Sequence, residues 1–161
     1  MVDRGLYQGY AITGIDAKGR VAIPASLRST IEKNGEGRIV TISREAGAPF
    51  LSGYDNKWGQ LLREQVRSDE SIERSGGSAF DRRNALRRSF GPVEEVPFDA
   101  SGRFILSKFM RDKAQLTDTA FFFGLGDIFE IWNPHVLLAT DGIDELMREV
   151  CEWLLTDRNA S

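Results

Sequence analysis

A short motif occurs twice in this chain, and its repetition is the strongest constraint on the fold. Residues 16–20 read Asp-Ala-Lys-Gly-Arg, and residues 99–103 read Asp-Ala-Ser-Gly-Arg. Each copy opens a longer stretch of matching pattern, in which apolar positions agree in kind and a second arginine recurs as Arg28 and Arg111. Such self-similarity indicates two copies of one structural unit. We therefore expect a fold built from two related halves.

The residues around both motifs predict the same order of elements in each half. A β-rich segment leads into the motif, whose Asp and Gly are typical of a turn, and a short strand and a short helix follow. A hairpin then ends at a residue suited to cap a helix, Asp55 in the first half and Asn133 in the second. We divide the chain into a first half at 7–56, a helical connection at 57–91, a second half at 92–137 and a C-terminal helix at 138–161.

The connection is expected to hold two helices. The first runs from Lys57 to about Ser68 and is followed by a polar break. The second covers residues 80–90 and carries four arginines, Arg82, Arg83, Arg87 and Arg88. Its candidates for burial are Ala85, Leu86 and Phe90.

The C-terminal helix shows apolar residues at spacings of three and four, which predicts a buried stripe. The stripe consists of Ile143, Leu146, Met147, Val150, Cys151 and Leu154. Thr140 or Asp141 is suited to cap this helix. Trp153 and Leu155 lie outside the stripe, and we expect them to pack on another subunit.

The composition is typical of a globular protein, and the single cysteine fits a reducing compartment. The chain has 161 residues, of which 41% are apolar and 28% charged. No apolar run approaches the roughly 20 residues that cross a bilayer, and the first residues lack the features of a signal peptide. Cys151 is the single cysteine, so no internal disulfide can form. We expect a cytoplasmic protein without a membrane partner.

The formal net charge of −3 argues only weakly against a nucleic-acid partner, because the charges are segregated. Basic residues gather around the first motif and at 82–88, whereas acidic residues gather in the C-terminal helix. A basic face can therefore exist on a mildly acidic protein. The alternative is that these runs are ordinary solvated helix faces.

The repeated motif has the composition of a loop that projects a cation. Asp16 and Asp99 would order the two turns, and the glycines that follow them, Gly19 and Gly102, permit a tight backbone. Arg20 and Arg103 leave these loops, and a fixed guanidinium can bind a phosphate or guanine. The alternative is an Asp–Arg ion pair that only holds the hairpin together.

Catalysis finds no support in the sequence. His135 is the only histidine and follows a helix-starting Asn-Pro, so we interpret it as a surface or cap residue, and Cys151 as a core residue. Metal-ligand spacing, a phosphate-binding loop and a nucleophile elbow are all missing. We expect no enzyme activity, no catalytic or metal-binding residue, no cofactor and no small-molecule substrate.

At these residues the chain resembles the MraZ family of bacterial transcription regulators, whose halves are AbrB-like domains. The resemblance extends over nearly the whole length. It covers Tyr7-x-Gly9, residues 16–28, the arginine-rich helix, residues 99–111 and the sequence Phe-Glu-Ile-Trp-Asn-Pro at 129–134.

The resemblance implies an α+β fold with a mainly β core and flanking helices. It implies that two swapped-hairpin halves form a double-split β-barrel with a pseudo-two-fold axis. The chain would assemble into a ring-shaped homo-oligomer and bind repeated sites in double-stranded promoter DNA ahead of the division and cell-wall gene cluster. As a repressor of that cluster and of its own promoter it would be nucleoid-associated. By position, the DNA contacts would be Lys18, Arg20 and Arg103.

Two positions depart from the family pattern. Lys18 and Pro24 of the first half are replaced by Ser101 and Ser107 in the second. The second copy therefore lacks one phosphate contact and has a less rigid helix start. A second function class stays open, namely a self-assembling ring scaffold that binds a protein partner without contacting DNA.

Overall fold

The computed structural model describes residues 3–73 and 78–160, and its elements occur in the same order twice. The first series is β1 (Tyr10–Gly14), β2 (Arg20–Ala22), α1 (Ala25–Asn34), β3 (Ile39–Ser43), β4 (Leu51–Tyr54) and α2 (Asn56–Glu73). After α3 (Ala79–Phe90), the second series is β5 (Val93–Pro97), β6 (Arg103–Ile105), α4 (Lys108–Lys113), β7 (Thr119–Gly124), β8 (Phe129–Trp132) and α5 (Pro134–Ala139). The helix α6 (Glu145–Ala160) closes the described chain.

The strands of the two series exchange partners. A six-stranded antiparallel sheet has the order β1-β7-β8-β4-β3-β5, so that β1 pairs with β7 and β3 pairs with β5. The two short strands β2 and β6 form a separate antiparallel sheet, which we call the ribbon. The predicted α+β class with a mainly β core and flanking helices is confirmed. Closure of ribbon and sheet into a double-split barrel stays a prediction, as do the four proposed segments.

The six-stranded sheet has a core on each face. One core lies between the sheet and the ribbon with its following helices, and it includes Val21, Leu27, Phe104 and Met110. The other core gathers Phe121, Trp132, Leu137, Met147 and Cys151 under α5 and α6. Val21 and Phe104 each point inward from the middle of a ribbon strand, which leaves the other face of the ribbon to solvent.

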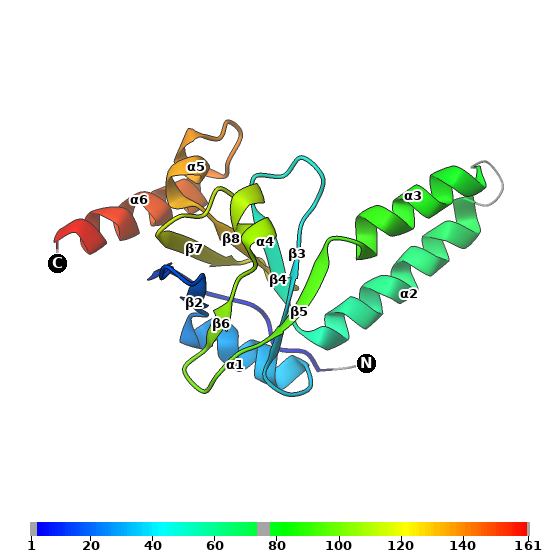
Figure 1. Ribbon diagram of the computed structural model, residues 1–161, viewed down its shortest axis with the longest axis horizontal. Helices are drawn as coiled ribbons and strands as arrows, with labels where there is room; N and C mark the ends of the chain where they lie inside the picture. Colours follow the sequence, from blue (N-terminus) through cyan, green and yellow to red (C-terminus); the bar gives the residue numbers. More distant parts are fainter. Residues whose placement is uncertain (1–2, 74–77, 161) are drawn as a thin grey trace.

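The helices α2 and α3 form a hairpin that projects from the sheets (Figure 1). Because α3 lies on this projection, the prediction of a buried face on it is wrong. Ala85 and Leu86 are only half-buried, and Phe90 is exposed. The helix α2 also continues to Glu73 rather than ending near Ser68, and Ser78 caps α3 by accepting a hydrogen bond from the backbone N–H of Asp81 (3.0 Å).

The C-terminal helix confirms the buried stripe in part. Met147 and Cys151 are buried, but Leu146 is 64% exposed. The cap is neither Thr140 nor Asp141, because the Asp144 carboxylate accepts from the backbone N–H of Met147 at 3.1 Å. Leu146 stands in the first turn of α6.

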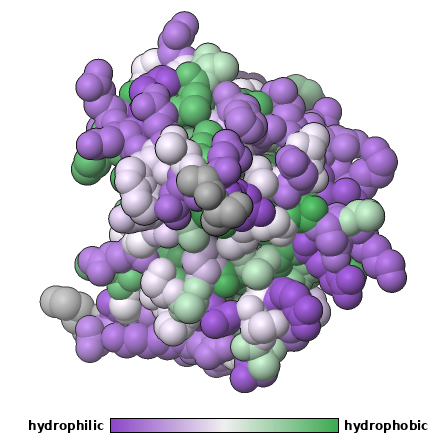
Figure 2. Space-filling view, turned by 90° about the vertical axis from the view of Figure 1, so that its left-hand side faces the viewer, coloured by the Kyte–Doolittle hydropathy of each residue, from purple (hydrophilic) through white to green (hydrophobic). Residues whose placement is uncertain are grey.

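Trp153 and Leu155, in the second half of α6, differ in how far they are buried. Trp153 is 63% exposed, whereas Leu155 is half-buried against the second core. Packing of these residues on another subunit stays a prediction. The side of the molecule on which α6 ends is mainly hydrophilic, with apolar side chains between the hydrophilic ones (Figure 2). Within residues 3–73 and 78–160, no helix combines the length and apolar character that crossing a bilayer requires.

Candidate nucleic-acid interface

The first repeated motif folds into a loop that is organised by one carboxylate. Asp16 Oδ1 accepts hydrogen bonds from the backbone N–H groups of Lys18 and Arg20, both at 2.9 Å. Asp16 Oδ2 accepts from Arg20 Nε at 2.7 Å. The backbone N–H of Arg20, followed by its side chain, lowers the pKa of Asp16. The loop therefore holds a charged carboxylate and a fixed guanidinium group.

The second motif repeats this geometry with one addition. Asp99 accepts from the backbone N–H groups of Ser101 (2.9 Å) and Arg103 (3.0 Å), and from Arg103 Nε at 3.0 Å. The Ser101 hydroxyl also donates to Asp99 Oδ1 at 2.8 Å. The Arg103 N–H and then the Ser101 hydroxyl lower the pKa of Asp99 strongly. Ser101, which replaces a lysine, thus gives up a cation and adds a donor to its own loop.

The expected Asp–Arg ion pair is present in both loops, but it leaves most of each guanidinium group available. Each pair uses only Nε of the arginine. The side chains of Arg20 and Arg103 remain 50% and 60% exposed. In residues 3–73 and 78–160, neither arginine uses its terminal amino groups in a hydrogen bond. Each aspartate therefore orients its arginine without occupying it.

The ribbon brings the two arginines together on one face. Arg20 pairs with Ile105, Val21 with Phe104 and Ala22 with Arg103. Successive residues of a strand alternate between faces, so the face opposite buried Val21 and Phe104 carries both Arg20 and Arg103. They occupy diagonal positions, as a local two-fold arrangement would place them. Lys18 is exposed in the loop beside Arg20.

Each loop is held in place by the other half of the chain. The N–H of Leu106 donates to the carbonyl of Gly19, and the N–H of Ile23 donates to the carbonyl of Gly102, both at 2.9 Å. Gly19 and Gly102 have φ angles of +83° and +84°, which favour glycine. A Cβ at Gly102 would lie 2.6 Å from Nη1 of Arg28, which reaches it from α1.

The ribbon surface is hollowed on both sides of the arginine pair. One hollow of about 340 Å³ extends from Asp16 and Arg20 to Arg103, and a second of about 400 Å³ extends from Asp99 and Arg103 to Arg20. Each arginine thus borders both hollows. Two further basic residues border the loops, because Arg28 lies against Gly102 and Arg111 lies against Gly19.

Other candidate residues lie apart from this surface. The cluster Arg82–Arg88 lies on α3, in the projecting hairpin, and not beside the ribbon (Figure 1). His135 is exposed in the first turn of α5, and Cys151 is buried, as the sequence predicts. In the described residues, no group of three or more His, Cys, Asp and Glu side chains is placed to hold a metal ion.

Hydrogen bonds of Ser107 fix the start of α4, and the sequence did not predict them. Pro24 precedes α1 without making a side-chain cap, whereas Ser107 caps α4 by accepting from the Met110 N–H at 3.3 Å. The Ser107 hydroxyl also donates to Glu94 at 2.9 Å. The serine therefore replaces the conformational restriction of proline with two hydrogen bonds.

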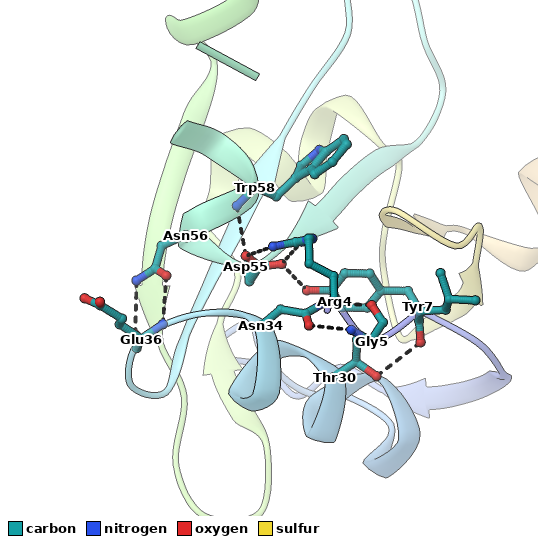
Figure 3. A network of polar contacts seen from close by, with 10 residues as sticks. Arg4, Gly5, Tyr7, Thr30, Asn34, Glu36, Asp55, Asn56 and Trp58 are labelled. Atoms are coloured by element: carbon teal, nitrogen blue, oxygen red, sulfur yellow. Dashed lines mark hydrogen bonds and ion pairs between the residues drawn. The ribbon is translucent and has the colours of Figure 1, made fainter. Parts of the chain in front are cut away.

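A buried polar network that sequence reasoning missed fixes the N-terminal segment (Figure 3). The fully buried carboxylate of Asp55 binds Arg4 Nη2 at 2.6 Å and accepts from the hydroxyl of Tyr7 (2.8 Å) and the N–H of Trp58 (2.9 Å). Burial alone would raise the pKa of Asp55, but the hydrogen bonds from Arg4 and Tyr7 outweigh it and lower the pKa. Asp55 is the predicted cap of α2, and its role in this network was not evident from the pattern.

Several relatives that share one name align with this chain over most of their length. The protein of Saccharophagus degradans named Transcriptional regulator MraZ is 30% identical over 149 residues, which are 90% of this chain and 97% of the relative. Proteins of the same name from Rhodospirillum rubrum and Xanthobacter autotrophicus are 33% identical over 129 residues and 30% identical over 141 residues. These alignments cover 80% and 84% of this chain and 79% and 85% of the relatives. No protein-family model matches the sequence.

Proposed function

Because the chain belongs to the MraZ family of transcriptional regulators, and not to a family of enzymes, we propose that it regulates transcription by binding promoter DNA through the ribbon. Lys18, Arg20 and Arg103 contact the DNA. The loops that carry them are ordered by Asp16, Gly19, Asp99 and Gly102. The target is double-stranded promoter DNA with repeated sites, ahead of the division and cell-wall gene cluster and including the regulator's own promoter. The regulator represses this cluster and is nucleoid-associated.

One observation carries the proposal, namely that Arg20 and Arg103 share the outward face of a two-stranded ribbon. The major groove of B-DNA is wide enough to admit such a ribbon. An arginine held by Nε still presents its terminal amino groups, which can bind a phosphate or the O6 and N7 atoms of guanine. The diagonal placement supplies two such groups from one surface.

A single ribbon makes few contacts, so the proposal includes a ring-shaped homo-oligomer. Binding by a few cations is weak at physiological salt, and the chain as a whole carries a net charge of −3. A ring that presents many ribbons to repeated sites gains affinity from effective concentration. The exposed Leu146 and Trp153 on α6 supply apolar area for contacts between subunits.

The same apolar residues are the observation that favours the alternative, a ring scaffold that binds a protein partner without DNA contact. The two functions differ in what Arg20 does. In the DNA-binding regulator, Arg20 contacts the ligand directly. In the scaffold, the Arg20–Asp16 pair only holds a hairpin together.

The decisive experiment is a gel-shift series with the DNA upstream of the regulator's own gene, carrying one, two or three repeats. Affinity is expected to rise steeply with the number of repeats, whereas equal affinity for all three would contradict the multivalent mechanism. Arg20→Ala should abolish the shift while sedimentation shows an unchanged assembly.

Arg38→Ala is a matched control for this series. Arg38 is 54% exposed and pairs with Glu32 at 3.4 Å, as Arg20 pairs with Asp16, but it precedes β3 in the larger sheet. This variant should bind DNA like the unaltered protein. If Arg20→Ala instead disrupts the assembly, the arginine serves structure and the scaffold is the better description.

A further inference from the structure

A cavity of about 420 Å³ lies where the projecting hairpin meets the edge region of the six-stranded sheet. None of its lining residues belongs to the ribbon or to the two repeated loops. Its lining comes from the end of β3 and the loop after it, from β4, from α2 and from the end of α3. The lining residues that bear most on ligand binding are Arg44, Glu45, Tyr54, Leu62, Arg88 and Phe90.

Arg44 is the unusual residue of this cavity. Its Nε atom is buried, yet it has no hydrogen-bond partner among the described residues. A buried donor without a partner costs on the order of 1–3 kcal/mol, and buried polar groups in folded proteins are nearly always paired. Arg44 also lines the cavity, so a ligand bound there lies beside this unpaired group.

A second orphaned polar atom lies on β3, three residues before Arg44. Thr41 Oγ1 is buried and has no partner in the described part of the chain. Thr41 stands directly opposite Tyr54 in the β3–β4 pair, so both side chains point to one face. Tyr54 in turn lines the cavity. Thr41 itself does not line the cavity, but its neighbour on the adjacent strand does.

The remaining lining residues divide the cavity into a polar and an apolar part. Arg88 adds a second guanidinium, and Ser43 and Ser89 add hydroxyl groups. The rings of Tyr54 and Phe90 and the side chain of Leu62 supply apolar surface. Glu45 contributes a carboxylate to the lining, and the nearby carboxylate of Glu95 acts on the Tyr54 hydroxyl. Arg44 and Arg88 are the lining groups that can attract an anion.

We propose that this cavity is a binding site for a small organic anion, in which a carboxylate or phosphate group binds Arg44 and Arg88 and an apolar group packs on Tyr54, Leu62 and Phe90. The volume is within the range of small-molecule sites, about 300–1,000 Å³. Arginine forks bind both kinds of anion through paired hydrogen bonds. Since the site connects β3 with α3, its ligand bridges the sheet and the projecting hairpin.

The test measures binding of phenyl phosphate and of phenylacetate to the full chain by calorimetry, with benzyl alcohol and inorganic phosphate as comparisons. At least one of the two organic anions should bind saturably and more tightly than either comparison compound. Which of the two binds better distinguishes a phosphate ligand from a carboxylate ligand. Absence of saturable binding by both at millimolar concentration would overturn the proposal, as would equal binding of benzyl alcohol.

Substitutions then assign the binding to the cavity. Arg44→Met and Arg88→Met should each weaken the anion about tenfold or more, because each removes a charge-assisted hydrogen bond. Arg83→Met, on the same helix but outside the lining, is the matched control and should leave affinity unchanged. Arg88 is exposed on the surface of α3, so Arg88→Met should fold normally. It keeps the test decisive even where Arg44→Met fails to fold. Equal losses in Arg88→Met and Arg83→Met would show general electrostatic attraction and refute the site.

Discussion

The guanidinium group of Arg111 lies against Gly19, so closely that a Cβ atom at position 19 would be 2.9 Å from its Cζ and Nε atoms. The same guanidinium donates from Nε to the carbonyl of Leu106 at 2.9 Å. The N–H of Leu106 donates to the carbonyl of Gly19. A closed set of contacts from the second half of the chain thus determines the shape of the first repeated loop, residues 16–20.

Gly19→Ala is expected to destabilise the protein and weaken DNA binding. A left-handed φ of +83° costs a non-glycine residue about 1–2 kcal/mol, and the Cβ would also meet the Leu106 carbonyl at 3.0 Å. We expect a loss of at least about 2 kcal/mol in the free energy of unfolding, measured by urea denaturation at fixed protein concentration.

The control for this substitution is Gly37→Ala. Gly37 also has a positive φ, +70°, but nothing lies within 4 Å of the Cβ position. This variant should show only the conformational cost and should bind DNA normally. If both alanine variants lose the same stability and the same affinity, the contact with Arg111 contributes nothing to the loop.

Asp55→Ala is expected to cost about 3 kcal/mol in the free energy of unfolding. The substitution leaves the charge of Arg4 and the hydroxyl of Tyr7 without their acceptor in a mostly buried site. Asp127→Ala, in an exposed loop, should change stability little. A small effect of Asp55→Ala in the same urea titrations would mean that the N-terminal segment is not held by this network.

The contribution of Asp55 should also depend on pH in a defined direction. Its pKa in the folded protein is lowered, because the hydrogen bonds from Arg4 and Tyr7 outweigh the opposing effect of burial. A carboxyl with a lowered pKa stabilises the fold above its unfolded pKa and loses this effect as the pH falls through the folded pKa. The stability difference between the unaltered protein and Asp55→Asn should therefore stay constant down to about pH 4 and shrink below it.

Ser101→Lys should strengthen DNA binding, because it restores to the second loop the cation that Lys18 supplies in the first. The substitution keeps the backbone N–H that donates to Asp99 and removes only the hydroxyl donor. One added phosphate contact should make the logarithm of affinity fall more steeply with salt, by about 0.9 per contact. Unchanged affinity and salt dependence would indicate that the second loop does not approach the DNA.

Ser101→Ala isolates the effect of the hydroxyl on the loop itself. The Ser101 hydroxyl is, after the Arg103 N–H, the second cause of the lowered pKa of Asp99. Its removal should raise the pKa of Asp99 toward the ordinary value, as measured by NMR titration of the side-chain carboxyl. The pKa of Asp16, which has no such hydroxyl partner, should not move and serves as the internal reference.

Cys151 is expected to react slowly with Ellman's reagent in the folded protein. Burial raises the pKa of its thiol to about 11, and its Sγ lies 3.7 Å from the Pro134 carbonyl. At about pH 8 the thiolate fraction should be roughly a hundredfold lower than in the unfolded chain, and the reaction slower by at least that factor. Reaction at the same rate with and without denaturant would contradict the buried position.

Local chemistry made much of the fold predictable. The turn of Asp16, the cap of α2 at Asp55 and the cap of α5 at Asn133 all depend on residues within four positions of one another. Such contacts are determined by short-range geometry. For the same reason the order of strands and helices could be predicted almost element by element.

Contacts between distant residues could not be predicted in this way. The pairing of β1 with β7 and of β3 with β5 depends on which surfaces meet in three dimensions, not on the pattern of either strand. Burial on α3 was predicted wrongly because apolar spacing does not reveal whether a helix lies on a core or projects from it. The Arg20–Asp16 pair could be predicted from the motif, but the position of Arg20 and Arg103 on one face depends on the pairing of β2 with β6.

The exchange of contacts between the two loops has a consequence for how the halves can diverge. If one half existed alone, Leu106 N–H and Gly19 carbonyl could meet only across two identical chains, and every substitution would appear twice in the pair. Within a single chain each substitution appears once, so one copy can lose a lysine or a proline while the other retains it. Ser101 and Ser107 are changes of this kind. Because the two halves are one chain, the two loops of the ribbon can differ in sequence, although each loop still depends on hydrogen bonds from the other half.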